Sequence, residues 1–277
     1  MRNMETPFLE LLPEKIRTPV ELPRVSRERL TATLRESLDS CNSTVVTGRA
    51  GTGKSMLVRD FARLCGRRVA WYKVDAPDAE LRVFFQYLCA SVGAERQGFG
   101  RKTLERLGES VGSEDVPLLV EYFVYELLER DEPLLIVVDD LHLVYDADWV
   151  VPFFRRLLPL LPQEVHMILI GRGLPPAPLW RMRSKQTLCV VDEGELAFTR
   201  DEAEHLFESY GLTPSDARVA LAQTRGRAST LDAFARTARV REEASRLAAL
   251  RGEGRRTTGR LRLVKGFNRK SSLGGAS

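Results

Sequence analysis

The sequence has 277 residues, 43% of them hydrophobic and 29% charged, with a formal net charge of +4, which is typical of a globular protein of one or two domains and excludes a fibre. The four cysteines form no C-x-x-C pair and the three histidines are scattered, which argues against a disulfide scaffold or a structural zinc site and for reduced thiols. No segment approaches the roughly 18 to 20 apolar residues of a membrane helix, and the first residues lack the apolar core of a signal peptide, so we expect a cytoplasmic protein without membrane contact.

An N-terminal arm and a short helix make up the first predicted region, residues 1–42. Four prolines interrupt the arm, and a helical pattern then runs from Val25 to about Leu38. A β-branched run, Thr44–Thr47, follows as the first predicted strand. We expect the arm to lead through the helix into this strand.

The strand enters a loop of the pattern G-x-x-x-x-G-K-[ST], and an amphipathic segment from Met56 to Leu64 leaves it. This strand-loop-helix context is the one that a phosphate-binding P-loop requires, whereas a simple glycine-rich turn would not explain the Lys and Ser after the last glycine. The glycines let several backbone N–H groups point at one anion, at the positive end of the following helix. The sequence therefore predicts an ATP or ADP site formed by Gly48, Ala50, Gly51, Thr52, Gly53, Lys54, Ser55 and Met56.

Two side chains at the end of this loop carry its chemistry. Lys54 is expected to reach the β and γ phosphates of the nucleotide and to act in catalysis. The Ser55 hydroxyl is expected to hold Mg²⁺.

The next elements are expected to build the sheet and its covering helices. Residues 67–75 form a second strand by their β-branched and aromatic content. Apolar residues at helical spacing between Leu81 and Val92 indicate a helix with a core-facing stripe. A polar connection over residues 98–112 precedes another amphipathic helix over residues 116–130.

A buried strand, Leu134–Val138, ends in the pair Asp139-Asp140. Five apolar residues are too few for a helix and describe a parallel strand buried on both faces, whose carboxyl end is where open α/β sheets bind ligands. The pair on its own also fits a helix N-cap with a charged neighbour. Downstream of a P-loop we interpret it as a Walker B pair, with Asp139 in the Mg²⁺ shell and Asp140 orienting or deprotonating the attacking water.

A helix over residues 149–161 and a further apolar strand, 165–170, lead to Arg172. A strand of the same sheet would deliver this guanidinium to the γ phosphate, where it could act in catalysis and report whether that phosphate is present. The alternative is a solvated loop arginine. A fifth strand is predicted over residues 187–191.

From residue 196 the sequence predicts helices alone. Thr199 and Glu202 have the spacing of a capping box, and helices follow to about Tyr210, over 214–223 and over 229–250. Residues 251–277 contain eight Lys or Arg and one acid, so this tail carries +7 and residues 1–250 carry −3. The tail lacks apolar periodicity and is expected to be disordered; it could contact nucleic acid phosphates, although a solvated end is the simpler reading.

These elements predict an α/β P-loop NTPase domain over residues 43–195, a small helical lid domain over 196–250 and the basic tail. Right-handed crossovers allow the Walker B strand either to neighbour the P-loop strand or to stand one strand away from it. The spacing of the elements does not choose between the two.

Taken together, several motifs resemble the nucleotide-binding region of the maltose-regulon activator and the large ATP-binding LuxR-type bacterial regulators, members of the signal-transduction ATPases with numerous domains. The match covers residues 8–240, and its motifs are the P-loop and the segments 11–16, 25–30, 71–75, 137–142, 170–176 and 196–199.

The resemblance implies a sheet in the order 5-1-4-3-2 and slow hydrolysis of ATP to ADP and phosphate. It also implies an ADP-bound resting form that an inducer converts into an ATP-bound, self-associating form. As an alternative, the chain is a stand-alone ATPase module that acts with a partner protein. It further places Arg27 near the adenine and Arg172 near the phosphates.

The sequence also departs from this family. Where the family has T-x-G-W-P, this chain has Arg227 and Ala228 in place of the aromatic residue and the proline that help to close the adenine pocket. The family continues into sensor and DNA-binding domains, but we find no recognition-helix pattern after Leu250, so DNA binding by this chain is not expected.

Two other functions fit the same motifs. An oligomeric ATPase of the loader or remodeller class would need an arginine finger on its surface and a protein or nucleic-acid client. A small-molecule kinase is disfavoured, because the Asp139-Asp140 pair is typical of hydrolytic P-loop proteins and no substrate pocket is evident.

Overall fold

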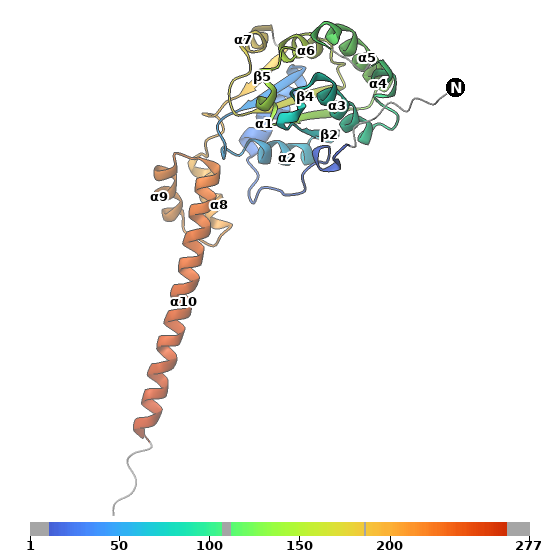
Figure 1. Cartoon of the computed structure of the whole chain (residues 1–277). Helices are drawn as coiled ribbons and strands as arrows, with labels where there is room; N and C mark the ends of the chain where they lie inside the picture. The colour runs from blue at the N-terminus through green and yellow to red at the C-terminus, as the bar shows by residue number, and fades with distance from the viewer. Residues whose placement is uncertain (1–10, 107–111, 186, 265–277) are drawn as a thin grey trace, which may run out of the picture.

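Five parallel strands form the central sheet of the protein, whose computed structural model describes residues 11–106, 112–185 and 187–264 (Figure 1). The spatial order is β2-β3-β4-β1-β5, which is the predicted order 5-1-4-3-2 in the opposite direction. The P-loop strand β1 and the strand β3 with the paired acids are therefore separated by β4, which settles the choice that the sequence left open. The strands are β1 (Ser43–Thr47), β2 (Arg68–Lys73), β3 (Leu134–Asp139), β4 (Val165–Gly171) and β5 (Leu188–Val191).

Helices cover both faces of the sheet. On one face, α1 (Glu28–Ser40) and α2 (Lys54–Leu64) pack against side chains such as Trp71 and Ile168. On the other, α3 (Leu81–Glu95), α5 (Val116–Leu128) and α6 (Val150–Leu157) form a large aromatic and aliphatic core. Figure 1 shows α2 opposite α5 and α6 across the sheet. The strands β1, β3 and β4 are buried on both faces. Accordingly, β3 and β4 are almost continuously apolar, whereas β1 contains Ser43, Thr44 and Thr47 beside two valines.

The predicted core-facing stripe of the third helix is confirmed, since Leu81, Phe84, Phe85, Leu88 and Val92 are all buried. Short elements complete the α/β domain. They are α4 (Arg101–Arg106), α7 (Ala177–Trp180) and the 3₁₀ turns η1 (Pro13–Lys15), η2 (Ala76–Ala79), η3 (Ser113–Asp115), η4 (Leu141–Val144), η5 (Leu158–Leu160) and η6 (Arg181–Lys185).

Three helices follow the sheet: α8 (Arg200–Glu208), α9 (Pro214–Thr224) and α10 (Ala228–Val264). They enclose a small apolar core of their own. The predicted capping box is confirmed, because the Glu202 backbone N–H donates to Thr199 Oγ1 at 3.3 Å and the Thr199 N–H donates to a Glu202 carboxylate oxygen at 3.0 Å.

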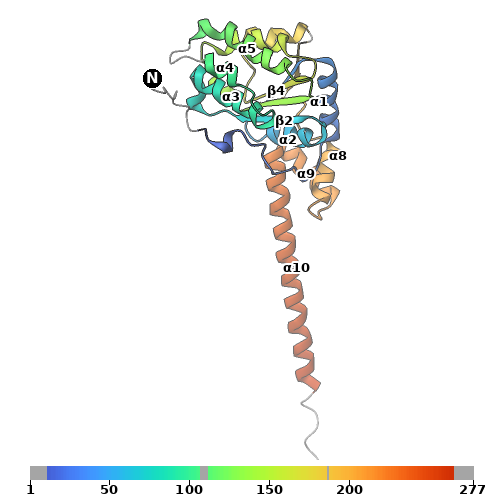
Figure 2. The same cartoon turned by 90° about the vertical axis from the view of Figure 1, so that its right-hand side faces the viewer.

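The last helix differs from the prediction of disorder from residue 251. It continues to Val264 and projects away from the sheet (Figure 2). Arginine and leucine are strong helix formers and make up half of residues 251–264, which continue the helix past the predicted boundary despite three glycines. The remainder of the predicted tail, residues 265–277, lies outside the described residues. Among the helices that the structure does describe, none combines the length and the apolar character needed to cross a lipid bilayer.

His166 is a buried titratable group on β4. Its Nδ1–H donates to the Cys41 carbonyl at 3.1 Å, and its Nε2 accepts from the Thr44 hydroxyl at 2.8 Å. Burial lowers the pKa of His166 from 6.5 to about 4. The folded protein therefore holds this imidazole neutral over a range in which an unfolded histidine is protonated.

We expect the free energy of unfolding to fall as the pH drops from 6.5 towards 4. In this window the unfolded chain binds a proton that the native chain does not, and the full loss from a shift of this size is about 3 kcal/mol. Chemical denaturation at several pH values measures it. The variant His166→Gln should flatten the dependence, whereas the exposed His205→Gln should retain it. Equal slopes for wild type and His166→Gln would contradict the assignment.

Candidate functional site

The P-loop wraps around the N-terminus of α2 at the carboxyl end of β1. Gly51 and Gly53 have φ angles of 80° and 90°, in the left-handed region that favours glycine, and Gly53 is the N-cap of α2. The Thr52 hydroxyl donates to the Arg49 carbonyl at 2.9 Å and closes the turn. Free N–H groups at the start of a helix, next to a turn of this shape, favour an anion.

Lys54 is buried beside the loop, with 8% of its surface exposed. Its ammonium donates to the carbonyls of Gly48 at 2.6 Å and Arg49 at 3.0 Å. Burial lowers the pKa of Lys54, and the nearby Asp140 opposes that shift. The loop thus holds a partly desolvated cation within its own turn.

Ser55 lies close to Asp139, the last residue of β3, and lines the same pocket as Asp140, which follows it. The Ser55 hydroxyl donates to Asp139 Oδ1 at 2.9 Å, and the Asp140 backbone N–H donates to the same oxygen at 3.0 Å. Burial and the charge of Asp140 raise the pKa of Asp139, although the bond from Ser55 opposes this. Asp140 precedes η4 but makes no side-chain capping bond, so the N-cap alternative does not describe it.

A pocket of about 290 Å³ brings most of these residues together. The exposed Arg172, directly after β4, lines this pocket, and its role at a γ phosphate stays a prediction. Arg59 also lines it, and sequence motifs did not identify this residue. The only signal for Arg59 was its position one helical turn after Ser55. The lining residues are Ala50, Gly51, Gly53, Lys54, Ser55, Met56, Arg59, Asp140 and Arg172.

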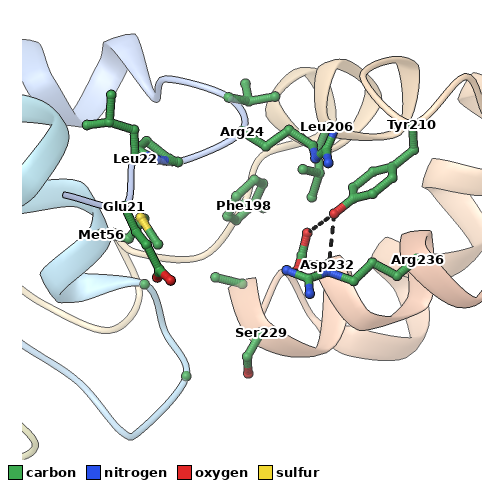
Figure 3. A pocket seen from close by; sticks show the side chains of 15 residues that line it. Glu21, Leu22, Arg24, Met56, Phe198, Leu206, Tyr210, Ser229, Asp232 and Arg236 are labelled. Carbon is green, nitrogen blue, oxygen red and sulfur yellow. Dashed lines mark hydrogen bonds and ion pairs between the residues drawn. The ribbon is translucent and has the colours of Figure 1, made fainter. Parts of the chain in front are cut away.

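A second pocket, of about 800 Å³, adjoins the first and shares Gly51, Gly53 and Met56 with it. It lies between residues 21–25 of the arm and the helices α8 and α10 (Figure 3). On the side of this pocket formed by the helices after the sheet, the Tyr210 hydroxyl donates a hydrogen bond to Asp232 at 2.6 Å. Apolar and aromatic side chains from the arm, from α2 and from the helices after the sheet, together with four charged side chains, thus surround a space next to the P-loop.

Arg27 ties the arm to the segment that follows β5. It is 6% exposed, and its guanidinium donates to the carbonyls of Leu196 at 2.9 Å and Ala197 at 3.0 Å and to the Glu202 carboxylate at 3.0 Å. The Phe198 ring lies 4.2 Å from it. Arg27 therefore already has partners, although it also borders a small cavity next to Gly53 and Met56. Its position near an adenine stays a prediction.

The start of α10 contacts the P-loop directly. The Ser229 backbone N–H donates to the Gly51 carbonyl at 2.9 Å, and the Arg227 guanidinium donates to the Ala50 carbonyl. A Cβ atom on Gly51 would lie 2.2 Å from the Ser229 hydroxyl oxygen. In the sequence, Arg227 and Ala228 stand out only as departures from a family pattern, which does not predict this contact.

The chain is similar to known proteins over most of its length. The sequence profile of the family described as "AAA ATPase domain" matches residues 24–170. The HTH-type transcriptional regulator MalT of Serratia proteamaculans is 31% identical over 250 residues, and that of Yersinia enterocolitica is 28% identical over 249 residues. Each alignment covers 87% of this chain but only 27% of the relative, so the chain spans about a quarter of the length of these regulators.

A solved structure shares the fold. The structure of Drosophila ORC bound to DNA superposes with a TM-score of 0.54 at 20% sequence identity, covering 90% of this chain and 70% of that chain. At this identity the likeness concerns the arrangement of strands and helices.

Proposed function

The chain belongs to the AAA ATPase domain family, and on that premise we propose that it is a nucleotide switch module of the type found in bacterial transcriptional regulators. The family implies that the chain binds a nucleotide. In the proposed switch, the chain exchanges ADP for ATP, hydrolyses ATP slowly, and associates with another copy or a partner protein in the ATP state.

The residues present fit such a ligand. The P-loop amides and Lys54 match a phosphate chain, and the larger pocket beside Met56 offers apolar walls for a base. Ser55 and Asp139 supply the hard oxygen donors that Mg²⁺ prefers. A bound Mg²⁺ would neutralise phosphate charge there. Lys54 and Arg172 would stabilise the terminal phosphate, and Asp140 would orient a water molecule.

The observation that carries the switch proposal is the contact between the start of α10 and the P-loop. Gly51 accepts a hydrogen bond from Ser229 and lies in both pockets. A ligand that changes the loop therefore acts on the helices after the sheet through one direct bond. A nucleotide can shift such an equilibrium only by the difference in its affinity for the two arrangements.

We expect MgATP and MgADP to give different hydrogen-exchange protection in residues 196–240 at saturating concentration, because only ATP brings a third phosphate to Arg172. Exchange measured by mass spectrometry tests this, and calorimetry confirms saturation. The variant Arg172→Gln should make the two patterns alike.

Identical patterns for both nucleotides in the wild type would contradict the switch but not nucleotide binding. Steady hydrolysis in the range of roughly 1 to 10³ s⁻¹ without a partner would indicate a working ATPase instead. Size-exclusion chromatography with each nucleotide then tests the proposed self-association.

A further inference from the structure

Arg59 is a cation of the 290 Å³ pocket that no motif assigns. It lies on α2, four residues after Ser55, and side chains at this spacing share one face of a helix. Ser55 points at Asp139, with which it forms a hydrogen bond of 2.9 Å. Arg59 consequently lies on the side of α2 that faces the acids of β3, and it lines the pocket with Asp140 and Arg172.

The guanidinium of Arg59 is not fully satisfied. Its Nε–H is buried, and within the described residues no acceptor lies within hydrogen-bonding distance. Arg63, one turn further along α2, instead donates to Asp60 at 3.4 Å. A buried donor without an acceptor costs free energy, so an anion that reaches Arg59 would recover it.

The effect of Arg59 on the pKa of Asp139 also places Arg59 on the face of α2 that is turned towards Asp139. Burial and Asp140 raise the pKa of Asp139, and the charge of Arg59 acts in the opposite direction. Arg59 is therefore close enough to influence the carboxylate that faces Ser55. Three of the lining side chains, Lys54, Arg59 and Arg172, are cations, and Asp140 is the acid among them.

The positions of these cations indicate which phosphate of a nucleotide each of them would contact. The loop amides and Lys54 surround the start of α2, where a diphosphate would already be held. Arg59 and Arg172 come from the second turn of α2 and from the end of β4, towards Asp139 and Asp140, where a third phosphate would extend.

We propose that Arg59 binds the terminal phosphate of ATP and thereby sets the preference of this site for ATP over ADP. This inference rests on the proposed nucleotide function. An arginine in this position offers several N–H donors to phosphate oxygens, which a neutral side chain cannot replace.

The test compares wild type with Arg59→Gln, Arg59→Lys and, as matched control, Arg63→Gln on the same helix. The dissociation constants of MgADP and of Mg²⁺ with a non-hydrolysable ATP analogue are measured by calorimetry on the full chain. For Arg59→Gln we expect about a tenfold loss of affinity for the analogue and less than a twofold change for ADP. Arg59→Lys should recover part of the loss, and Arg63→Gln should match wild type.

Equal losses for both ligands would assign Arg59 a purely structural role and overturn the proposal, as would unchanged affinity for the analogue. Thermal unfolding without ligand shows whether each variant is folded. If the folded wild type binds neither nucleotide, the proposed function fails. If the wild type binds both and Arg59→Gln binds both with the same affinities, only the role of Arg59 fails.

Discussion

Replacing Lys54 by alanine is expected to lower the affinity for both MgADP and MgATP by about 100-fold or more. Lys54 is 8% exposed, and its ammonium is already within hydrogen-bonding distance of the loop carbonyls, so it can turn to phosphate oxygens over a short path. Each hydrogen bond to a charged group contributes about 1.5–3 kcal/mol, and two such bonds account for a loss of this size. Unlike Arg59→Gln, this variant should also lose affinity for ADP, because Lys54 is expected to reach the β phosphate that both nucleotides carry.

Calorimetry measures the affinities, and thermal unfolding provides a second readout. A ligand at 100 times its dissociation constant stabilises the folded state by about 2.7 kcal/mol, and Lys54→Ala should lose this gain. Lys73→Ala, an exposed lysine at the end of β2, is the control and should retain it. Binding of MgADP by Lys54→Ala within threefold of wild type would refute the P-loop assignment.

Replacing Arg27 by methionine should destabilise the attachment of α8 by about 3–5 kcal/mol, the usual cost of removing one partner of a buried ion pair. The change removes the Arg27 donor from the Glu202 carboxylate, 12% exposed, and from the carbonyls of Leu196 and Ala197, while Glu202 keeps the bond from the Thr199 N–H. Methionine keeps much of the side-chain volume, so the effect isolates the lost polar contacts.

Hydrogen exchange of α1 and α8 without nucleotide measures this effect, because the contacts of Arg27 are made by the protein alone. Arg29 provides the matched control: it lies 3.5 Å from the same carboxylate but is 42% exposed, and exposed pairs contribute less than about 1 kcal/mol. Unchanged protection of α8 in Arg27→Met would mean that this arginine does not fasten the helices to the arm. The affinity of Arg27→Met for MgADP would then test its predicted place near the adenine.

The sequence by itself determined the elements whose signals are local. The P-loop was recognisable because glycines, lysine and serine at fixed spacing follow a strand and precede a helix. The capping box at Thr199 depends on residues three apart, and the buried strands are short apolar runs. The sheet order came from a family resemblance, since crossover handedness alone left two arrangements open.

Only the tertiary structure decided which distant residues meet. Arg27 pairs with Glu202 across 175 positions, and Ser229 reaches Gly51 from the first turn of α10. Such partners depend on how helices pack on the sheet, and the periodicity of a sequence carries no information about that packing. Arg59 is the clearest case. The helical pattern predicts that it follows Ser55 on one face of α2, but only the structure shows that its Nε–H is buried without a partner among the described residues and that it lines a pocket with Asp140 and Arg172.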